Sequence, residues 1–337
     1  MKAVVLGSGA WGTALAMALC DNGHDVTLWS HRPETTAILE QRRENPKLEG
    51  VRLPDTMKFS SDMACVADAD LVVSAPPSFA VRETAEKAAP WLRPDAVVVS
   101  VSKGIERDTG LRMSQIIRES IGDKCKVAVL SGPSHAEEVS RRLPTGCVAA
   151  SPDEAVACFV QDAFMSDYFR IYTSPDVVGV ELAAALKNVV ALSCGICDGM
   201  GYQDNTKALL MTRAMAEIAR LGVKLGGDRQ TFGGLAGMGD LIVTCTSMHS
   251  RNRRAGILIG QGRTAREAMG EVGAVVEGYY AAESVEQLSR KVEVEMPICH
   301  CVYETLYHGK QVQDVVRELM TRARKGEIEN AWSYPVK

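Results

Sequence analysis

The sequence predicts an α/β fold, with a doubly wound, mostly parallel sheet in an N-terminal domain and an all-helical C-terminal domain. The chain has 337 residues, enough for about two domains at roughly 150 residues each. In the first half, short β-branched runs alternate with helical stretches, which is typical of a parallel sheet. From about Pro175 long helical patterns follow one another without obvious strands. We therefore place the domains at residues 1–175 and 176–337.

The predicted strands are short runs that contain β-branched and other apolar residues. The predicted strands are residues 2–7, 25–29, 69–76, 96–102, 126–132, 145–151 and 169–174. Helical stretches between them include residues 13–22 and 113–122. The helices predicted for the second domain are residues 175–196, 206–222, 264–273, 279–292, 298–309 and 312–326. Residues 328–337 are expected to form a loosely attached tail.

Composition and charge exclude several classes of protein. The net charge is −4, which indicates neither a nucleic-acid surface nor a disordered acidic tail. No signal peptide is visible before the first strand, and ten cysteines then suggest free thiols in a reducing cytoplasm. The apolar run at residues 177–194 is nearly long enough to span a membrane. Glu181 and Lys187 within it favour a buried core helix instead.

The cysteine spacing leaves a metal or redox site open. Cys194 and Cys197 form a CxxC pair, and Cys299 and Cys301 supply two more thiols. Because the first pair lies in an apolar helical run and no second CxxC exists, buried inert thiols are the favoured interpretation. We predict no metal site.

The strongest motif stands at the start of the chain. Gly7, Gly9 and Gly12 form G-x-G-x-x-G directly after a strand and before a helix expected from Trp11 to Asn22. The first glycine allows a tight turn, the second a close approach of a pyrophosphate, and the third close helix–strand packing. The helix N-terminus adds partial positive charge. This arrangement predicts a dinucleotide-binding, Rossmann-type domain.

The residues after the second strand bear on which cofactor is used. An acidic residue there would bind the ribose 2′-hydroxyl of NAD. The sequence has Ser30, His31 and Arg32 instead, and Glu34 lies past the expected strand end. A cation suits the 2′-phosphate of NADP, so NADP is favoured over NAD, with mixed use open. The alternative is that Arg32 is a solvated loop residue.

Polar groups that need an explanation follow the later strands. Lys103 comes after one strand and residues 131–135, "SGPSH", after another; ligands bind at such strand ends in open α/β sheets. Asp240 and Thr244 lie in a glycine-rich stretch, which the basic cluster 250–254, "SRNRR", follows. A basic cluster is often a solvated surface, but Ser-Arg-Asn at a helix start also suits a phosphate.

Lys187 stands in the middle of the apolar run. An ammonium group out of water is costly unless it is paired or loses its proton. Burial and a second cation such as Lys103 would lower its pKa towards neutrality, as a general acid/base requires. Asn188 and Asp240 are expected to orient it. The alternative is a structural lysine that reaches the surface or pairs with an acid such as Glu181.

The motifs together resemble a known family. "GSGAWGTALA", "SKGIE", "SGPSHAEE", "ELAAALKNVVA", "LAGMGDLIVTCTS", "SRNRRAG" and "VVEGY" occur in the order found in NAD(P)-dependent glycerol-3-phosphate dehydrogenases of the bacterial type. The similarity runs from Lys2 to about residue 325. It implies a dimeric cytoplasmic enzyme that interconverts sn-glycerol 3-phosphate and dihydroxyacetone phosphate. In bacteria the family mainly supplies glycerol 3-phosphate for phospholipids.

The resemblance also implies roles for individual residues. Lys187 matches the general acid/base of the family, and Thr244 a substrate contact in eukaryotic relatives. The implied substrate-binding residues are Lys103, Gly132, Ser134, Asp240, Thr244, Ser250, Arg251 and Asn252. The implied cofactor-binding residues are Gly7, Gly9, Ala10, Trp11, Gly12, His31, Arg32, Lys103, Ala136, Arg251, Val275 and Glu277. His135 departs from the family, because many members have phenylalanine there, and it is expected to change packing beside the nicotinamide.

Two other functions remain open at this point. A related β-hydroxyacid dehydrogenase would share the two-domain plan and a catalytic lysine, but it would need a carboxylate site and has less use for "SRNRR". A cofactor-binding sensor or scaffold would keep the glycine loop. It would not need to keep Lys187, Lys103 and Asp240 together.

Overall fold

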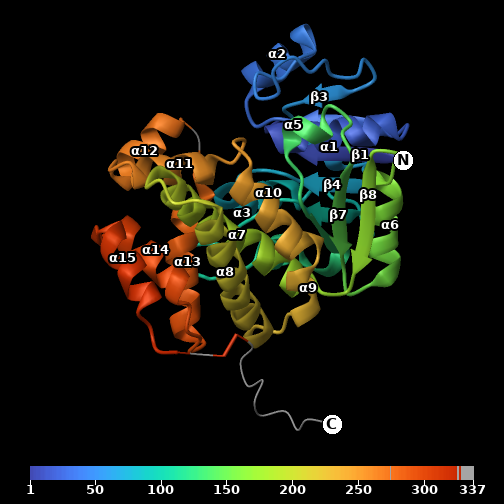
Figure 1. Cartoon of the computed structure of the whole chain (residues 1–337). Coiled ribbons are helices and arrows are strands. Elements are labelled where there is room, and N and C mark those ends of the chain that lie inside the picture. Colours follow the sequence, from blue (N-terminus) through green and yellow to red (C-terminus); the bar gives the residue numbers. More distant parts are fainter. Residues whose placement is uncertain (274, 325, 328–337) are drawn as a thin grey trace.

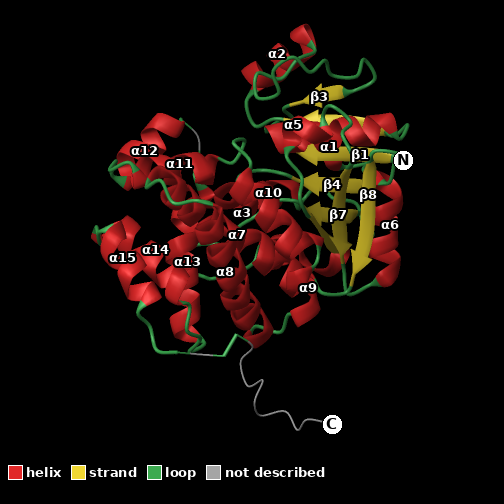
Figure 2. Ribbon diagram, viewed as in Figure 1, coloured by secondary structure: helices red, strands yellow, loops and turns green. Residues whose placement is uncertain are grey.

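The computed structural model describes residues 1–273, 275–324 and 326–327 and contains one eight-stranded sheet beside a group of helices (Figures 1 and 2). The strand order is β3-β2-β1-β4-β5-β6-β7-β8. The first six strands in this order are parallel, β7 is antiparallel to β6, and β8 is parallel to β7. The strands are β1 (Lys2–Leu6), β2 (Asp25–Trp29), β3 (Lys58–Ser60), β4 (Leu71–Ser74), β5 (Val97–Ser100), β6 (Lys126–Ser131), β7 (Thr145–Ala150) and β8 (Phe169–Ser174).

Helices cover both faces of the sheet, which confirms the doubly wound fold. α1 (Ala10–Asp21), α5 (Ala136–Val139) and α6 (Glu154–Phe164) pack on one face, in a core that includes Leu15 and Phe164. α3 (Val81–Ala88) and α4 (Met113–Ile121) pack on the other face, through side chains such as Ile116. α2 (Pro33–Arg42) follows β2. Gly23 after α1 has a φ of +77°, so this helix ends as predicted.

The sequence prediction missed β3. This strand has only three residues and one apolar side chain, Phe59, so it lacks a period that could be recognised. It pairs only with β2 at one edge of the sheet. All seven strands that the sequence predicts are confirmed, with ends that differ by up to two residues.

The second half is helical, as predicted. α7 (Val177–Gly199) forms its centre and is buried from Gly179 to Cys197. It is the one helix among the described residues that is long and apolar enough to cross a membrane, but 89% of its apolar window is buried inside the protein. The prediction of a core helix is therefore confirmed. The others are α8 (Asp204–Lys224), α9 (Arg229–Gly233), α10 (Asp240–Thr246), α11 (Arg251–Gly260), α12 (Ala265–Val272), α13 (Glu277–Lys291), α14 (Pro297–His308) and α15 (Val312–Met320).

Glycines let α7 and α11 cross at close range. A Cβ at Gly195 would lie 2.1 Å from the carbonyl oxygen of Arg253, and one at Gly256 would lie 2.1 Å from that of Leu192. The helix backbones therefore touch, as small residues permit. This contact brings the N-terminus of α11 to the middle of α7, where Lys187 lies.

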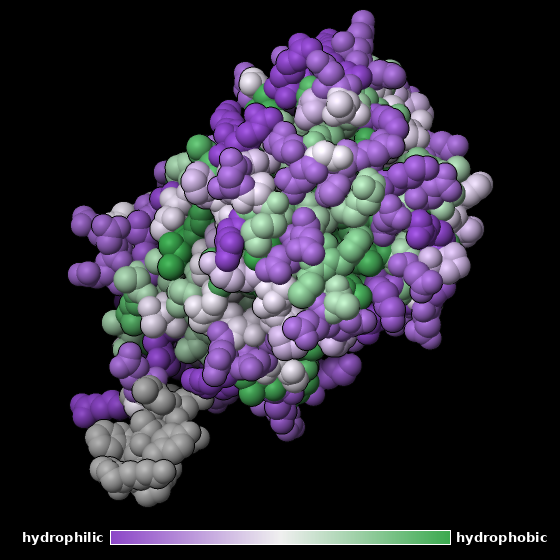
Figure 3. All heavy atoms as spheres, turned by 90° about the vertical axis from the view of Figure 1, so that its right-hand side faces the viewer, coloured by the Kyte–Doolittle hydropathy of each residue, from purple (hydrophilic) through white to green (hydrophobic). Residues whose placement is uncertain are grey.

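The surface is mixed. On the face that carries β8 and α6, hydrophilic and apolar residues are interspersed (Figure 3). Such a mixture is ordinary for folded proteins. The predicted tail, residues 328–337, lies outside the described residues.

Candidate active site

The glycine loop lies where the strand order reverses, between β1 and β4. Gly7 has a φ of +130°, and a Cβ there would lie 2.6 Å from the carbonyl oxygen of Ala75, after β4. A Cβ at Gly12 would lie 2.1 Å from the carbonyl oxygen of Gly7. Both glycines are therefore required by the fold itself.

Gly9 is different, because the fold does not require it. Its φ of −70° suits any residue, and a Cβ there would meet no protein atom within 4 Å. No side chain caps the helix that starts after it, so the first N–H groups of α1 keep free hydrogen-bonding capacity. Open space beside free N–H groups and a helix N-terminus fits the pyrophosphate of a dinucleotide.

We expect Gly9→Ala to leave folding intact but to weaken cofactor binding at least tenfold, because its methyl group would fill the space in which the phosphates lie. Fluorescence titration with NADPH and thermal unfolding would measure the two effects. Gly12→Ala is the matched control, since its methyl group would clash with backbone and lower the melting temperature. Unchanged cofactor affinity in Gly9→Ala would contradict a pyrophosphate site here.

The end of β2 presents a basic group and no acidic residue. His31 and Arg32 are exposed, and the Arg32 Nε donates to the His31 Nε2 at 3.1 Å. Glu34 lies in the first turn of α2, past the strand end, as expected. Ser30 is buried at the strand end. The guanidinium is thus exposed at the strand end where Rossmann-type domains bind the cofactor ribose.

A link between the two halves of the chain was missed by the sequence prediction. Ser78, after β4, donates to the Glu277 carboxylate at 2.9 Å. Burial raises the pKa of Glu277, which the Ser78 hydroxyl and Arg251 oppose. Val275, two residues before Glu277, is half buried. The "PPS" after the strand was the available signal, because strand-end polar residues tend to line ligand sites.

Lys187 lies at the centre of a buried polar cluster. Its ammonium donates to the Asp240 Oδ1 at 2.5 Å and to the Thr244 hydroxyl. The other oxygen of Asp240 accepts from Lys103 at 2.7 Å. Two cations thus share one carboxylate that is almost fully buried. Lys187 lies on α7, Asp240 begins α10, and Lys103 lies in the loop after β5.

The charges of this cluster tune one another. Burial lowers the pKa of Lys187 to about 8; Asp240 opposes this shift, and Lys103 adds to it. Burial alone would raise the pKa of Asp240, but Lys103 and Lys187 hold it below its usual value. Asp240 is therefore ionised at neutral pH, while Lys187 readily gains and loses a proton. A lysine with this property suits general acid/base chemistry.

The loop after β6 adjoins this cluster. Lys103 donates to the Gly132 carbonyl at 3.1 Å, and the Ser134 hydroxyl donates to the same oxygen at 2.9 Å. A Cβ at Gly132 would lie 2.8 Å from the Cα of Cys147, so the glycine is needed for packing. His135 lies with its ring centroid 5.7 Å from that of His249, and burial together with Lys187 lowers the pKa of His135.

Helix α11 carries the expected phosphate-binding residues, but they are not equivalent. The Ser250 hydroxyl caps the helix by accepting from the Arg253 N–H at 3.2 Å. Asn252 is buried; it donates to Asn188 at 3.0 Å and accepts from the Gly278 N–H at 2.8 Å. Arg251 is exposed, and its guanidinium has no hydrogen bond or ion pair within the described part of the chain. Of these three residues, Arg251 is therefore the one whose side chain is free to bind an anion.

Two alternatives drawn from the sequence are corrected. Lys187 does not pair with Glu181, which instead binds Ser114 and Arg112. The Asn188 side chain does not orient the Lys187 ammonium, which binds Asp240 and Thr244; it accepts a hydrogen bond from Asn252 instead. Glu181 and Ser114 lie far apart in the sequence, as do Asn188 and Asn252, so local sequence patterns could not predict either contact.

The cysteines are free thiols, and those of the CxxC pair are buried in α7. Burial raises the pKa of Cys197 to about 12, which keeps the thiol protonated and unreactive. Among the described residues, no group of three histidine, cysteine or acidic side chains is placed to hold a metal ion.

Comparison with known proteins decides the family. Residues 2–157 match the model of the N-terminus of NAD-dependent glycerol-3-phosphate dehydrogenase, and residues 176–317 match that of its C-terminus. The chain belongs to this family. The glycerol-3-phosphate dehydrogenase [NAD(P)+] of Moorella thermoacetica is 52% identical over 97% of each chain, and that of Bacillus subtilis is 47% identical over 98% of this chain and 96% of its own.

The fold also matches a solved member of the family. The crystal structure of the glycerol-3-phosphate dehydrogenase from Coxiella burnetii is 33% identical, with a TM-score of 0.91 over 95% of this chain and 99% of its own. Membership in this family decides against the β-hydroxyacid dehydrogenase interpretation.

For this glycerol-3-phosphate dehydrogenase family member, the structure shows how the predicted residues group. Lys103, Gly132, Ser134, Lys187, Asp240 and Thr244 form one connected hydrogen-bond network. Ala10 and Trp11 begin α1 beside the glycine loop, and Ala136 begins α5. Val275 and Glu277 stand at the start of α13, and Ser250, Arg251 and Asn252 at that of α11. His31 and Arg32 follow β2, farther along the same edge of the sheet.

Proposed function

We propose that the protein interconverts sn-glycerol 3-phosphate and dihydroxyacetone phosphate with NAD(P)(H). The observation that carries this proposal is the buried Lys187–Asp240–Lys103 cluster, which gives one lysine a pKa of about 8. The free guanidinium of Arg251 supports a phosphorylated substrate. The roles of the other site residues follow from their positions and from the family resemblance, and they belong to the same proposal.

The chemistry requires one proton and one hydride. The nicotinamide cofactor, when bound, exchanges the hydride with the secondary carbon. In reduction, Lys187 donates its proton to the ketone oxygen; in oxidation, its neutral amine accepts the proton of the hydroxyl. Asp240 and Thr244 hold the Lys187 nitrogen in place. When Lys187 is neutral, Asp240 and Lys103 still form a balanced pair, so no buried carboxylate is left without a cation.

We expect a pH dependence with opposite signs in the two directions. The ordinary pKa of lysine is lowered to about 8 at Lys187. Reduction requires the ammonium, so kcat/KM for dihydroxyacetone phosphate should fall as the pH rises through about 8. Oxidation requires the amine, so kcat/KM for glycerol 3-phosphate should rise over the same range. Initial rates from pH 6 to 10 would measure both profiles. Two profiles of the same sign would contradict the assignment.

NADPH is the favoured cofactor in this proposal, with NADH as an alternative. The supporting observation is the exposed Arg32 beside His31, without an acidic residue at the end of β2. From the family resemblance alone, we further propose a cytoplasmic homodimer. It would work mainly in the reducing direction, to supply glycerol 3-phosphate for glycerophospholipid synthesis.

The test is the absorbance of the nicotinamide band with purified protein and dihydroxyacetone phosphate, in parallel with NADPH and NADH. Consumption of either cofactor supports the reaction, and faster consumption of NADPH at equal low concentrations supports the role of Arg32. Cofactor binding without consumption would overturn the proposed activity and favour a sensor or scaffold.

A further inference from the structure

A buried ion pair joins the two halves of the chain at a distance from the candidate active site. Glu181, on α7, has a side chain that is only 4% exposed. Its Oε1 accepts from the Ser114 N–H at 2.8 Å, and its Oε2 accepts from the Ser114 hydroxyl at 2.6 Å. Arg112 donates to the same Oε2. Ser114 lies in the first turn of α4, which packs on the sheet, so both oxygens of Glu181 are held by the cofactor-binding half.

The position of this contact ties it to Lys187. Lys187 lies six positions after Glu181 on one continuous helix without proline, a rise of about 9 Å. The two side chains leave α7 in different directions, Glu181 toward α4 and Lys187 toward α10. Because an uninterrupted helix moves as a unit, a shift of α7 at Glu181 also shifts the nitrogen of Lys187.

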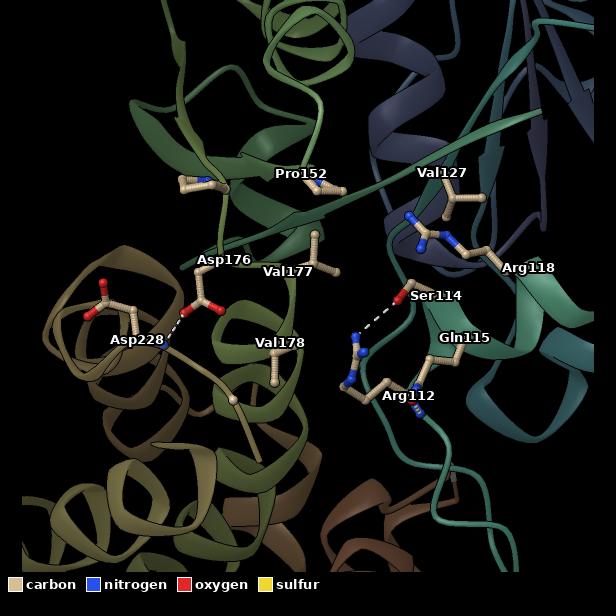
Figure 4. Close-up of a pocket in the computed structure, with 12 residues that line it drawn as sticks. Arg112, Ser114, Gln115, Arg118, Val127, Pro152, Asp176, Val177, Val178 and Asp228 are labelled. Atoms are coloured by element: carbon tan, nitrogen blue, oxygen red, sulfur yellow. Dashed lines mark hydrogen bonds between the residues drawn. The ribbon is translucent and has the colours of Figure 1, made fainter. Parts of the chain in front are cut away.

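The packing at the start of α7 is incomplete on the side that faces α4. A cavity of about 410 Å³ lies beside Arg112 and Ser114, between the start of α4 and the start of α7 (Figure 4). Its lining includes Ser114 and Arg118 of α4 with the preceding Arg112 on one side, and Val177 and Val178 of α7 with the preceding Asp176 on the other (Figure 4). The Glu181 contact therefore bridges the interface at the edge of a gap.

Apolar contact continues beyond the gap, where Val180 packs against Val129 and Ala150 of the sheet. Apolar contact resists separation, but it is non-directional and tolerates sliding. Hydrogen bonds to both oxygens of a carboxylate have preferred distances and angles, so they fix the register.

We propose that Glu181 is a positioning residue, whose buried contact with Ser114 and Arg112 sets α7, and with it Lys187, against the cofactor-binding half of the protein. This inference rests on the proposed function, because it concerns the placement of Lys187 relative to the cofactor. Misplacement of a catalytic group by about 1 Å costs up to roughly a hundredfold in rate.

The test compares three variants with the wild type in reduction of dihydroxyacetone phosphate. Glu181→Gln should lower kcat roughly ten- to a hundredfold and leave the KM for NADPH nearly unchanged. The kinetic isotope effect with NADPH deuterated at the transferred position should increase, because hydride transfer becomes rate-limiting. Arg118→Ala is the matched control; it removes an exposed cation from the same cavity wall and should keep the wild-type kcat.

A double variant separates positioning from mere stability. Arg112→Met with Glu181→Leu removes both charges, so no unpaired charge remains buried and the protein should fold stably. It lacks the directional contact, so its kcat should stay as low as that of Glu181→Gln. This variant carries the test even where the single variant does not fold.

Two results would overturn the inference: wild-type kcat in Glu181→Gln, or recovery of wild-type kcat in the double variant. These outcomes are distinct from failure of the proposed function. If the proposed function were wrong, the wild-type protein itself would consume neither NADPH nor NADH.

Discussion

Lys187→Ala should lower kcat in both directions by about 100- to 10,000-fold, the usual contribution of a general acid/base. The side chain is the only group in the described cluster that combines a pKa near 8 with a position between Asp240 and Thr244. Asp240 keeps Lys103 as its partner, so the variant leaves no unpaired charge. Steady-state rates with NADPH and dihydroxyacetone phosphate would measure the loss.

The control for this variant is cofactor affinity. Lys187 does not touch the glycine loop, so the dissociation constant for NADPH should stay within about twofold of the wild type. Lys187→Met, which keeps most of the side-chain volume, should lose as much activity as Lys187→Ala while avoiding a cavity in the core. If either variant kept the wild-type kcat, Lys187 would be a structural lysine and the proton would have to come from elsewhere.

Much of the fold was predictable from local patterns. The strand–glycine–helix unit at the N-terminus follows from residues 2–23 alone, because a tight turn, a helix start and a helix stop are encoded by neighbouring residues. The apolar run around Lys187 likewise predicts a buried helix by its composition. β3 was not predicted because a strand of three residues at the edge of a sheet is too short to show an alternating pattern of apolar residues.

The candidate site was predictable as a set of residues, but not as a set of contacts. The position of Lys103 after a predicted strand, and of Asp240 in a glycine-rich stretch, marked each as a candidate site residue. Their contact could not be predicted, because they lie 137 positions apart in the sequence. Nothing local distinguishes Glu181 from Asp240 as the partner of Lys187. Local sequence patterns also could not predict that Asn252 on α11 forms hydrogen bonds within the protein while the neighbouring Arg251 forms none among the described residues.

Arg251→Ala should raise the KM for dihydroxyacetone phosphate roughly 10- to 100-fold, the effect of losing a hydrogen-bonded ion pair with a phosphate. Its guanidinium is exposed and makes no hydrogen bond or ion pair among the described residues, and its charge only opposes the raised pKa of the buried Glu277, so the melting temperature should fall only slightly. Binding energy from the phosphate also orients the reacting carbon, so a smaller loss in kcat should accompany the rise in KM. Initial-rate kinetics and thermal unfolding would measure these effects.

Arg254→Ala provides the matched control, because this arginine is also exposed on the first turns of α11 and its loss changes the net charge equally. A general electrostatic effect would act in both variants, whereas a phosphate contact acts in Arg251→Ala alone. Dihydroxyacetone without phosphate sharpens the comparison: the wild type and Arg251→Ala should reduce it equally slowly. Asn252→Ala should instead lower the melting temperature, because it breaks the bonds to Asn188 and Gly278. An unchanged KM in Arg251→Ala would mean that the phosphate binds elsewhere.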